Sequence, residues 1–590
     1  MWSRQSSSGS LIIVWLKNGH TQFRLLRSCK FNDAMFRCFT RAGENGMAKL
    51  KTVDAVIVGA GFSGLYLLYL MRCQGFTTRV FEKGGNVGGT WYWNRYPGAR
   101  CDVESMQYSY SFDEELQQEW SWPEKYSAQP DILAYINHVA EKYQLSRDIT
   151  FNSSVTGANF EEDSKVWKVV VDNGEVVNAR HLIMATGCIS TANLPKIPGI
   201  NNFNGCTYHT GNWPHQKVDF SGQNVGIIGT GSSGIQSIPV IAAEAKHLTV
   251  FQRTPHWSVP ARNVPMTEDY EKSWKDSYAE RRAQMRYSPS GSLRSVAPID
   301  LSALDVTDEE REQAYRERWT AGGMTLLKSY NDLLTNDAAN ETAAKWVRKR
   351  IAGIVQDPKV ADLLSPKTYP IGTKRLCLDT NYYETFNREN VELVDIIKEP
   401  IDRITRSGLE ALGRSFDFDS IVFATGFDAM TGTLLRVDLR GRGGLYLSEK
   451  WEAGPRTYLG LMTEGFPNMY TITGPGSPSV KSNMMSSIEQ HVELVVEMLV
   501  YFRDNDIETI EPDLSAEDDW VEHVQEVASK TLFPKANSWY MGANIPGKPQ
   551  LFMPYIGGVG AYRKICEEVV AEGYRGFNFE YKNTKATATG

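Results

Sequence analysis

The residues best suited to chemistry in this sequence are one carboxylate and two cations that lie far apart along the chain. Asp102 ends an aromatic and glycine-rich stretch, residues 88–102 (GGTWYWNRYPGARCD). A carboxylate in such surroundings needs a cationic partner. The later stretch 369–379 offers two, Lys374 and Arg375. A guanidinium held beside a reacting centre would stabilise developing negative charge, because arginine stays charged at any working pH.

A first nucleotide site is predicted at residues 54–82. The apolar run 54–58 is followed by the glycine turn 59–64 (GAGFSG), an apolar helix and a second strand that ends at Glu82. The first glycine makes the turn, the second lets a pyrophosphate approach the backbone, and the third allows close helix–strand packing. Glu82 stands where an acid binds ribose hydroxyls. The candidate ligands of this site are Gly59, Gly61, Phe62, Ser63, Gly64 and Glu82.

A second nucleotide site is predicted from the same pattern at residues 224–254. Here the strand after the glycine turn ends in Gln252 and Arg253 instead of an acid. A guanidinium at this place suits a 2′-phosphate, so we expect FAD in the first site and NADPH in the second. The alternative is that Arg253 is a solvated surface charge. The candidate ligands are Gly229, Thr230, Gly231, Ser232, Ser233, Gly234, Ile235, Gln236, Gln252, Arg253 and Thr254.

The segment between the two sites has the features of a joint. It reads F-x-G-x-x-x-H-x-x-x-W-P, with Phe203, Gly205, His209, Trp213 and Pro214 at its marked positions. Glycine permits positive φ, proline fixes φ, and the aromatic rings provide packing with a polar handle. We expect His209 to be a structural hinge residue and not a catalyst.

The pattern as a whole indicates an α/β protein with two Rossmann-like dinucleotide-binding domains and a helical insertion in the NADPH domain. Two strands that end in Ala-Thr-Gly, at residues 185–187 and 424–426, are expected to be the crossings between the domains. The expected parts are an N-terminal extension (1–48), the FAD domain (49–188 and 428–580), the NADPH domain (189–427, with the insertion at about 265–360) and a tail (581–590).

Composition excludes several classes of protein. The net charge of −7, without a basic stripe, argues against nucleic acid as a partner. The eight cysteines show no metal-ligand spacing, so no metal site is predicted, and no apolar run is long enough for a membrane span. Residues 1–46 carry seven Lys/Arg and two acids. We expect a cytoplasmic protein with a disordered extension or a start at Met47, or a mitochondrial one if this stretch is a transit peptide.

Residues 88–102 and 203–214 resemble, at every fixed position, the two signatures of type I Baeyer–Villiger monooxygenases. Flavin-containing monooxygenases that oxidise nitrogen or sulfur share the hinge pattern but end it without Trp-Pro. The resemblance runs from about residue 50 to about 580. Residues 474–484 and 538–546 are similar to the substrate loop and C-terminal loop of the phenylacetone monooxygenase type.

The resemblance implies a mechanism and roles for residues. NADPH would reduce FAD, O2 would give a C4a-peroxyflavin, and attack on a ketone would yield an ester or lactone. Arg375 would stabilise the peroxyanion and Asp102 would hold Arg375, while Lys374 would join Arg253 and Thr254 at the 2′-phosphate.

The resemblance also implies further contacts, which fall into three groups. Those to FAD are Thr90, Trp91, Tyr92, Trp93, Asp102 and Tyr108. Those to NADP are Arg100, Cys101, Asp102, Lys374 and Trp539. The substrate pocket would contain Val480, Lys481, Met484 and Trp539.

Three alternatives remain at this stage. One is an N- or S-oxygenating flavin monooxygenase, against which Trp213-Pro214 and the pair Asp102/Arg375 speak. A dithiol oxidoreductase lacks the paired cysteines it would need. A flavoprotein without turnover would hardly keep both dinucleotide folds. The identity of the ketone stays open among small aryl, cyclic and larger polycyclic compounds.

Overall fold

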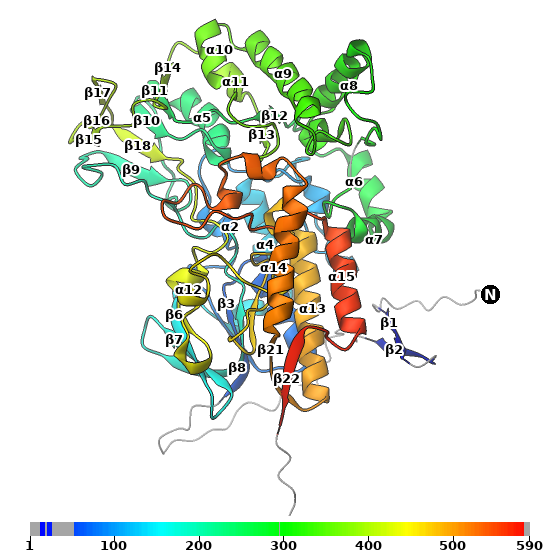
Figure 1. Cartoon of the computed structure of the whole chain (residues 1–590). Helices are drawn as coiled ribbons and strands as arrows, with labels where there is room; N and C mark the ends of the chain where they lie inside the picture. The colour runs from blue at the N-terminus through cyan, green and yellow to red at the C-terminus, as the bar shows by residue number, and fades with distance from the viewer. Residues whose placement is uncertain (1–11, 18–19, 26–51, 294–295, 583–590) are drawn as a thin grey trace, which may run out of the picture.

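The computed structural model describes residues 12–17, 20–25, 52–293 and 296–582. Two sheets with parallel cores dominate it, one in the lower part of the view in Figure 1 and one in the upper part. The strand order is β19-β6-β7-β8-β3-β4-β5 in the first, with β20 beside β8, and β14-β11-β10-β18-β9 in the second. The predicted fold class, α/β with two Rossmann-like domains, is confirmed.

The first sheet forms where the sequence alternates apolar strands with a glycine turn and a helix. Strand β3 (Val53–Val58) pairs in parallel with β4 (Thr78–Phe81) and with β8 (Val176–Met184). Helix α1 (Phe62–Cys73) connects β3 to β4 and packs on α13 (Met484–Asp504). The remaining elements of this part are α2 (Thr90–Trp93), α3 (Glu114–Glu119), α4 (Gln129–Lys142), β5 (Ile149–Thr150), β6 (Val155–Glu161), β7 (Val166–Val171), β19 (Asp438–Arg440), α12 (Leu447–Lys450), β20 (Met469–Thr471), β21 (Ile507–Pro512), α14 (Leu514–Ser529), α15 (Val559–Ala571) and β22 (Phe577–Tyr581).

The second sheet repeats the arrangement. Strand β10 (Asn224–Ile228) lies in parallel between β11 (His247–Gln252) and β18 (Ser420–Phe423), and α5 (Ser232–Glu244) connects β10 to β11. Pro239 lies within α5 without ending it. The other strands and helix of this part are β9 (Cys206–His209), β12 (Ser258–Pro260), β13 (Cys377–Asp379), α11 (Tyr382–Thr385), β14 (Val391–Asp395), β15 (Arg403–Ile404), β16 (Gly408–Ala411) and β17 (Arg414–Asp417).

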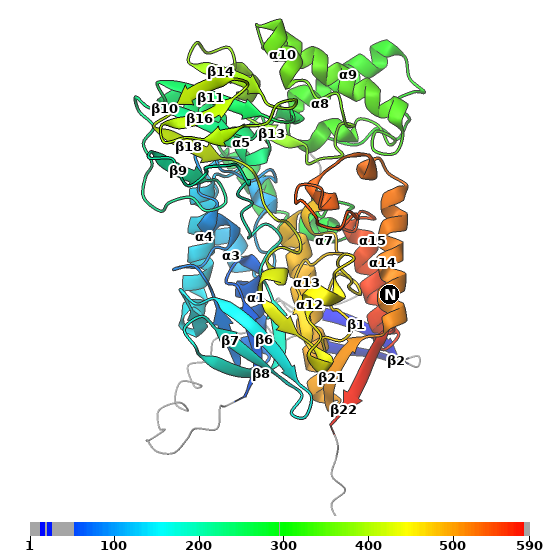
Figure 2. The same cartoon turned by 60° about the vertical axis from the view of Figure 1, so that its left-hand side comes forward.

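The helical insertion divides between the two parts, which the sequence did not indicate. Its helices are α6 (Glu268–Lys275), α7 (Tyr278–Tyr287), α8 (Asp308–Ala321), α9 (Asp337–Ile354) and α10 (Pro358–Leu364). The last three pack in the core of the second sheet, at the top of Figure 2. Trp274, Tyr278 and Met285, on α6 and α7, instead belong to the core around α1 and α13. The helices of the insertion therefore pack in two cores, that of the second sheet and that around α1 and α13.

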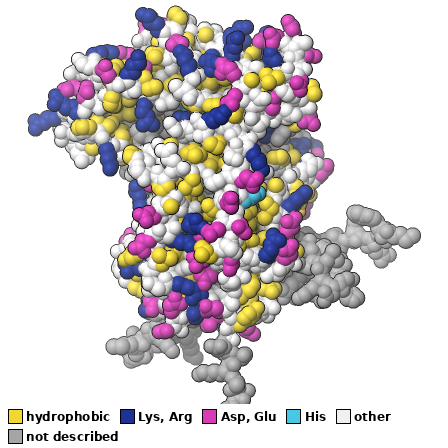
Figure 3. All heavy atoms as spheres, viewed as in Figure 1, with side chains coloured by type: hydrophobic (Ala, Val, Ile, Leu, Met, Phe, Trp, Pro, Cys, Tyr) yellow, Lys and Arg dark blue, Asp and Glu magenta, His cyan; other side chains and the backbone are white. Residues whose placement is uncertain are grey.

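Most residues at the two chain ends lie outside the described residues. Strands β1 (Ile12–Lys17) and β2 (His20–Leu25) form an antiparallel pair, while the rest of the expected extension and residues 583–590 of the expected tail lie outside the described residues. Among the residues that are described, no helix combines the length and apolarity needed to cross a membrane. Acidic and basic side chains are interspersed on the face shown in Figure 3.

Candidate active site

Both glycine turns leave space where a pyrophosphate would approach. A Cβ on Gly59 would come within 2.7 Å of the Ala185 carbonyl oxygen, and one on Gly64 within 1.9 Å of the Gly59 carbonyl oxygen. At the middle glycine, Gly61, the nearest atom would be 3.5 Å away. The first and third glycines are therefore required by packing, whereas the middle one faces the ligand side, as a dinucleotide fold needs.

The second turn has the same construction. A Cβ on Gly229 would meet the Ala424 carbonyl oxygen at 2.5 Å, and one on Gly234 would meet the Gly229 carbonyl oxygen at 2.4 Å. A Cβ on Gly231 would have no neighbour within 4 Å. The backbone N–H groups at the beginnings of α1 and α5 are accordingly open to phosphate oxygens.

The hydroxyl groups of the second turn fix its shape. Thr230 donates to the Thr254 carbonyl oxygen at 3.1 Å. Ser232 Oγ lies 3.0 Å from Cys377 Sγ, and Ser233 Oγ lies 3.0 Å from Thr210 Oγ1. In the first turn the corresponding side chain, Ser63, is buried.

The charged residues at the strand ends differ as expected between the two sites. The Glu82 carboxylate accepts hydrogen bonds from the N–H groups of Ala60 and Gly84, both at 2.7 Å, which places it beside the first turn. Burial raises the pKa of Glu82, and these two N–H donors oppose the rise. Near the second turn, burial and the adjacent Arg253 lower the pKa of Lys374. Two cations kept close together form a fitting site for a phosphate dianion.

Some predicted contact residues have side chains that are engaged elsewhere. Gln252 is buried and donates to the Leu363 carbonyl oxygen at 2.8 Å. Ile235 is fully buried in the core of the second sheet, and Phe62 packs edge-on against Tyr108 at a centroid distance of 5.7 Å. These side chains shape the turns, and only the backbone of Phe62 and Ile235 remains for a nucleotide.

The loop of residues 88–102 joins the two nucleotide-binding parts through Gln236 of α5. Its Oε1 accepts from the Tyr96 hydroxyl at 2.8 Å, and its Nε2 donates to the Arg100 carbonyl oxygen at 3.1 Å. The Arg100 guanidinium donates to Glu124 at 2.8 Å. The neighbouring Cys101 is buried, and burial raises the pKa of its thiol to about 12. This thiol is therefore protonated at neutral pH.

Aromatic side chains line the beginning of the same loop. Trp91, in α2, donates from Nε1 to the hydroxyl of Tyr108 at 3.2 Å. Tyr92 and Trp93 meet edge-to-face at a centroid distance of 5.0 Å. The beginning of this loop lies beside the first glycine turn, since a Cβ on Gly61 would come within 3.5 Å of Gly89.

Asp102 and Arg375 form an ion pair between segments 273 positions apart. Asp102 Oδ2 accepts from Arg375 Nε at 3.1 Å and from Nη2 at 3.0 Å. The Asp102 side chain is 6% exposed and that of Arg375 is 32% exposed. Burial acts to lower the pKa of Arg375, but the Asp102 carboxylate more than offsets this, so the pKa is raised. The guanidinium is therefore permanently charged, held from one side and open on the other.

The C-terminal loop completes the surroundings of Arg375. Burial raises the pKa of Tyr540, and the positive charge of Arg375 opposes this rise. Trp539 lies against Tyr540 at a centroid distance of 4.2 Å. The ammonium group of Lys481 lies 4.6 Å from the centre of the same Tyr540 ring. Arg375, Trp539, Tyr540 and Lys481 are thus brought together by the fold, although Tyr540 was not among the predicted site residues.

An apolar patch adjoins this group. Val480, Met484 and Trp539 pack on a small buried cluster formed by Cys188, Ala429, Met430 and Met553. The backbone of Ser479 has φ +38°, a strained value for serine, and its Oγ lies 3.0 Å from Cys188 Sγ. This contact holds Ser479 against Cys188.

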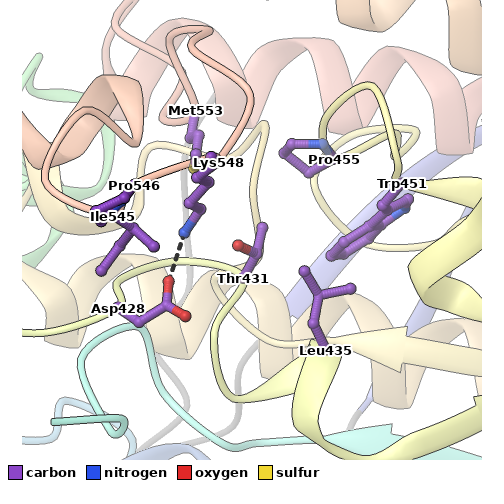
Figure 4. Close-up of a pocket in the computed structure, with 10 residues that line it drawn as sticks. Asp428, Thr431, Leu435, Trp451, Pro455, Ile545, Pro546, Lys548 and Met553 are labelled. Carbon is purple, nitrogen blue, oxygen red and sulfur yellow. Dashed lines mark hydrogen bonds and ion pairs between the residues drawn. The ribbon is translucent and has the colours of Figure 1, made fainter. Parts of the chain in front are cut away.

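Met553 also faces a cavity of about 240 Å³, shown in Figure 4. Its wall carries the ion pair of Lys548 with Asp428, at 2.8 Å, between the C-terminal loop and the crossing after β18. None of the lining residues was among the predicted site residues, although Ile545 and Pro546 belong to the C-terminal loop 538–546. The lining residues are Asp428, Thr431, Leu435, Trp451, Pro455, Ile545, Pro546, Gly547, Lys548 and Met553.

Residues 203–214, the joint between the two glycine turns, are held by backbone contacts and burial. Residues 206–209 form edge strand β9, and Gly205 has no room for a Cβ, which would meet the Asp419 carbonyl oxygen at 2.5 Å. His209 accepts from the Gly211 N–H at 2.9 Å, and burial lowers its pKa. Trp213, which precedes Pro214, is buried, while Phe203 packs at the edge of a neighbouring cluster.

Comparison with known proteins identifies the wider group. Residues 56–286 match a family described as pyridine nucleotide-disulphide oxidoreductase. A Baeyer–Villiger monooxygenase of Pseudooceanicola batsensis is 42% identical over 527 residues, 88% of this chain and 95% of that protein. A phenazine N-monooxygenase of Lysobacter antibioticus is 38% identical over 528 residues, 89% of this chain and 96% of that protein.

Solved structures agree over the same length. An oxidised steroid monooxygenase bound to NADP is 50% identical, with a TM-score of 0.86, and covers 90% of this chain and 100% of that chain. OTEMO in complex with FAD and NADP is 39% identical, with a TM-score of 0.87, and covers 90% and 100% of the two chains. The chain therefore belongs to the type I Baeyer–Villiger monooxygenases, FAD-dependent enzymes that consume NADPH to insert one oxygen atom of O2 into a ketone C–C bond.

Proposed function

We propose that Arg375 is the catalytic cation of this monooxygenase and that Asp102 is its positioning partner. The observation that carries the proposal is the ion pair itself. The Asp102 side chain is almost fully buried, while the Arg375 side chain is 32% exposed and interacts electrostatically with Tyr540, which Trp539 contacts. A fixed cation whose pKa is raised cannot protonate a reacting oxygen, but it can stabilise negative charge that develops there.

The bound cofactors supply the hydride and the activation of O2, and the chain binds and orients them. We infer that the turn at Gly59–Gly64, with Glu82, holds FAD, and that the turn at Gly229–Gly234 holds NADPH. Arg253 and Lys374 would bind the 2′-phosphate, which is supported by the effect of the Arg253 charge in lowering the pKa of Lys374. The hydrogen bonds between Gln236 and residues 96–100 would keep the two cofactor sites aligned.

We infer that the ketone rests on the apolar patch of Val480, Met484 and Trp539, with Met553 behind it. The steroid monooxygenase with 50% identity suggests that the pocket accepts bulky ketones as well as small ones. Buried aromatic and methionine side chains exclude water, which limits release of hydrogen peroxide without product.

The decisive experiment is oxygenation of phenylacetone against a matched thioether, with NADPH and purified holoenzyme. We expect benzyl acetate as the main product, with one NADPH consumed per ester. Dominant sulfoxide formation would favour the heteroatom-oxygenating alternative. NADPH consumption with no oxygenated product from either compound would contradict both.

A further inference from the structure

Lys481 occupies a position in the substrate loop where an ammonium group has no obvious structural task. It ends the short helix Ser479–Lys481 and lies three residues before α13 begins. The neighbouring Val480 contributes to the apolar patch beside Trp539. Lys481 as a whole residue is half-buried.

Two aromatic rings hold the ammonium group in place. Lys481 Nζ lies 4.0 Å from the centre of the Phe533 ring and 4.6 Å from the centre of the Tyr540 ring. Ring faces attract a cation but do not neutralise it. Within the described parts of the chain, no carboxylate forms an ion pair with Lys481.

The charges around Lys481 are of the same sign. Burial lowers the pKa of Lys481 to about 7, and the nearby cations Arg375 and Lys328 contribute to this shift. The Asp102 carboxylate, which is the ion-pair partner of Arg375, already accepts two hydrogen bonds from that residue. An anion that enters beside Tyr540 would therefore meet a positive field and an ammonium group in need of a counter-charge.

We propose that Lys481 is a specificity residue that binds a carboxylate carried by the ketone substrate. This inference rests on the proposed function, because it assumes that the ketone group of the same substrate lies at the Arg375 site while its carboxylate lies at Lys481. A single ammonium group flanked by apolar rings suits one compact negative charge. The 2′-phosphate of NADPH has its own pair of cations in Arg253 and Lys374.

The test compares oxo acids with their methyl esters, which differ in charge but keep the same ketone. A series of phenyl-substituted oxo acids with one to four methylene groups between carbonyl and carboxylate covers the unknown spacing. For the wild-type holoenzyme we expect at least one acid to exceed its ester in kcat/KM. Lys481→Met should lower that acid-to-ester ratio tenfold or more, and Lys481→Arg should restore most of it.

Lys535, close in sequence to Phe533, provides a control variant. Lys535 follows Phe533 in the helix Phe533–Lys535, but it is exposed and pairs with Asp337. Lys535→Met should leave the acid-to-ester ratio unchanged.

Equilibrium binding separates this inference from the proposed function. Titration calorimetry of the oxidised holoenzyme with NADP+ present needs no turnover, and the acid should bind more tightly than the ester in the wild type only. If such binding depends on Lys481 while no ketone is oxygenated, the proposed function fails and the inference stands. Two results would overturn the inference: equal affinity for acid and ester across the series, or an effect of Lys481→Met on NADP+ affinity alone.

Discussion

Substitution of Asp102 by Asn tests how strongly the rate of ester formation depends on the ion pair that positions the Arg375 guanidinium. Asn has the shape of Asp, so the loop of residues 88–102 keeps its packing, but the charge that attracts the guanidinium is lost. The wild-type Oδ2 accepts from two nitrogen atoms of Arg375, at 3.1 and 3.0 Å. Hydrogen bonds to charged groups contribute about 1.5–3 kcal/mol, and tenfold in rate corresponds to about 1.4 kcal/mol. We therefore expect ester formation to slow by about 10- to 100-fold.

The assay separates reduction from oxygenation. Anaerobic stopped-flow absorbance measures reduction of FAD by NADPH, and gas chromatography measures ester formed per NADPH consumed. Asp102→Asn should be reduced at close to the wild-type rate, while the ester yield falls and hydrogen peroxide rises. As a control, Glu410→Gln removes the carboxylate of the exposed Arg403–Glu410 pair and should change neither quantity. Wild-type ester yield in Asp102→Asn would refute the positioning role.

Three further predictions concern the nucleotide sites and the substrate loop. Arg253→Ala should raise the KM for NADPH at least tenfold more than the KM for NADH, because a partner of the 2′-phosphate is lost; equal effects in steady-state kinetics would make Arg253 a surface charge. In Gly231→Ala the added Cβ has no neighbour within 4 Å, so the variant should fold but bind NADP+ weakly by calorimetry. In Gly234→Ala the added Cβ would lie 2.4 Å from the Gly229 carbonyl oxygen, so the melting temperature should fall. Normal melting of both variants would contradict this distinction. The pKa of Lys481 is lowered to about 7, so its ammonium form is present below that pH. We therefore expect kcat/KM for an oxo acid to fall as the pH rises through about 7, while kcat/KM for the ester does not. Parallel pH profiles for acid and ester would speak against the assignment.

The parts of the structure that were predictable from sequence are those with a local pattern. Both glycine turns combine strand, turn and helix within about 30 residues, so Gly59 and Gly229 could be located without a structure. The pair of Asp102 and Arg375 spans 273 positions; the residue types indicated Lys374 or Arg375 as the partner, and the family resemblance selected Arg375.

Other features depend on packing that periodicity does not encode. Helices α6 and α7 read as charged surface helices, but Trp274 and Tyr278 anchor them to the core around α1 and α13. No sequence pattern singled out Phe533 or Tyr540 as site residues. Their importance appears only when the fold places both rings beside the ammonium group of Lys481.

The most direct test of the central claim is the product balance of Arg375→Ala. If Arg375 is the cation that stabilises charge during oxygen insertion, this variant will still bind FAD and oxidise NADPH. It will release the oxygen as hydrogen peroxide with no ester from phenylacetone. A normal yield of benzyl acetate per NADPH from the same variant would contradict the account.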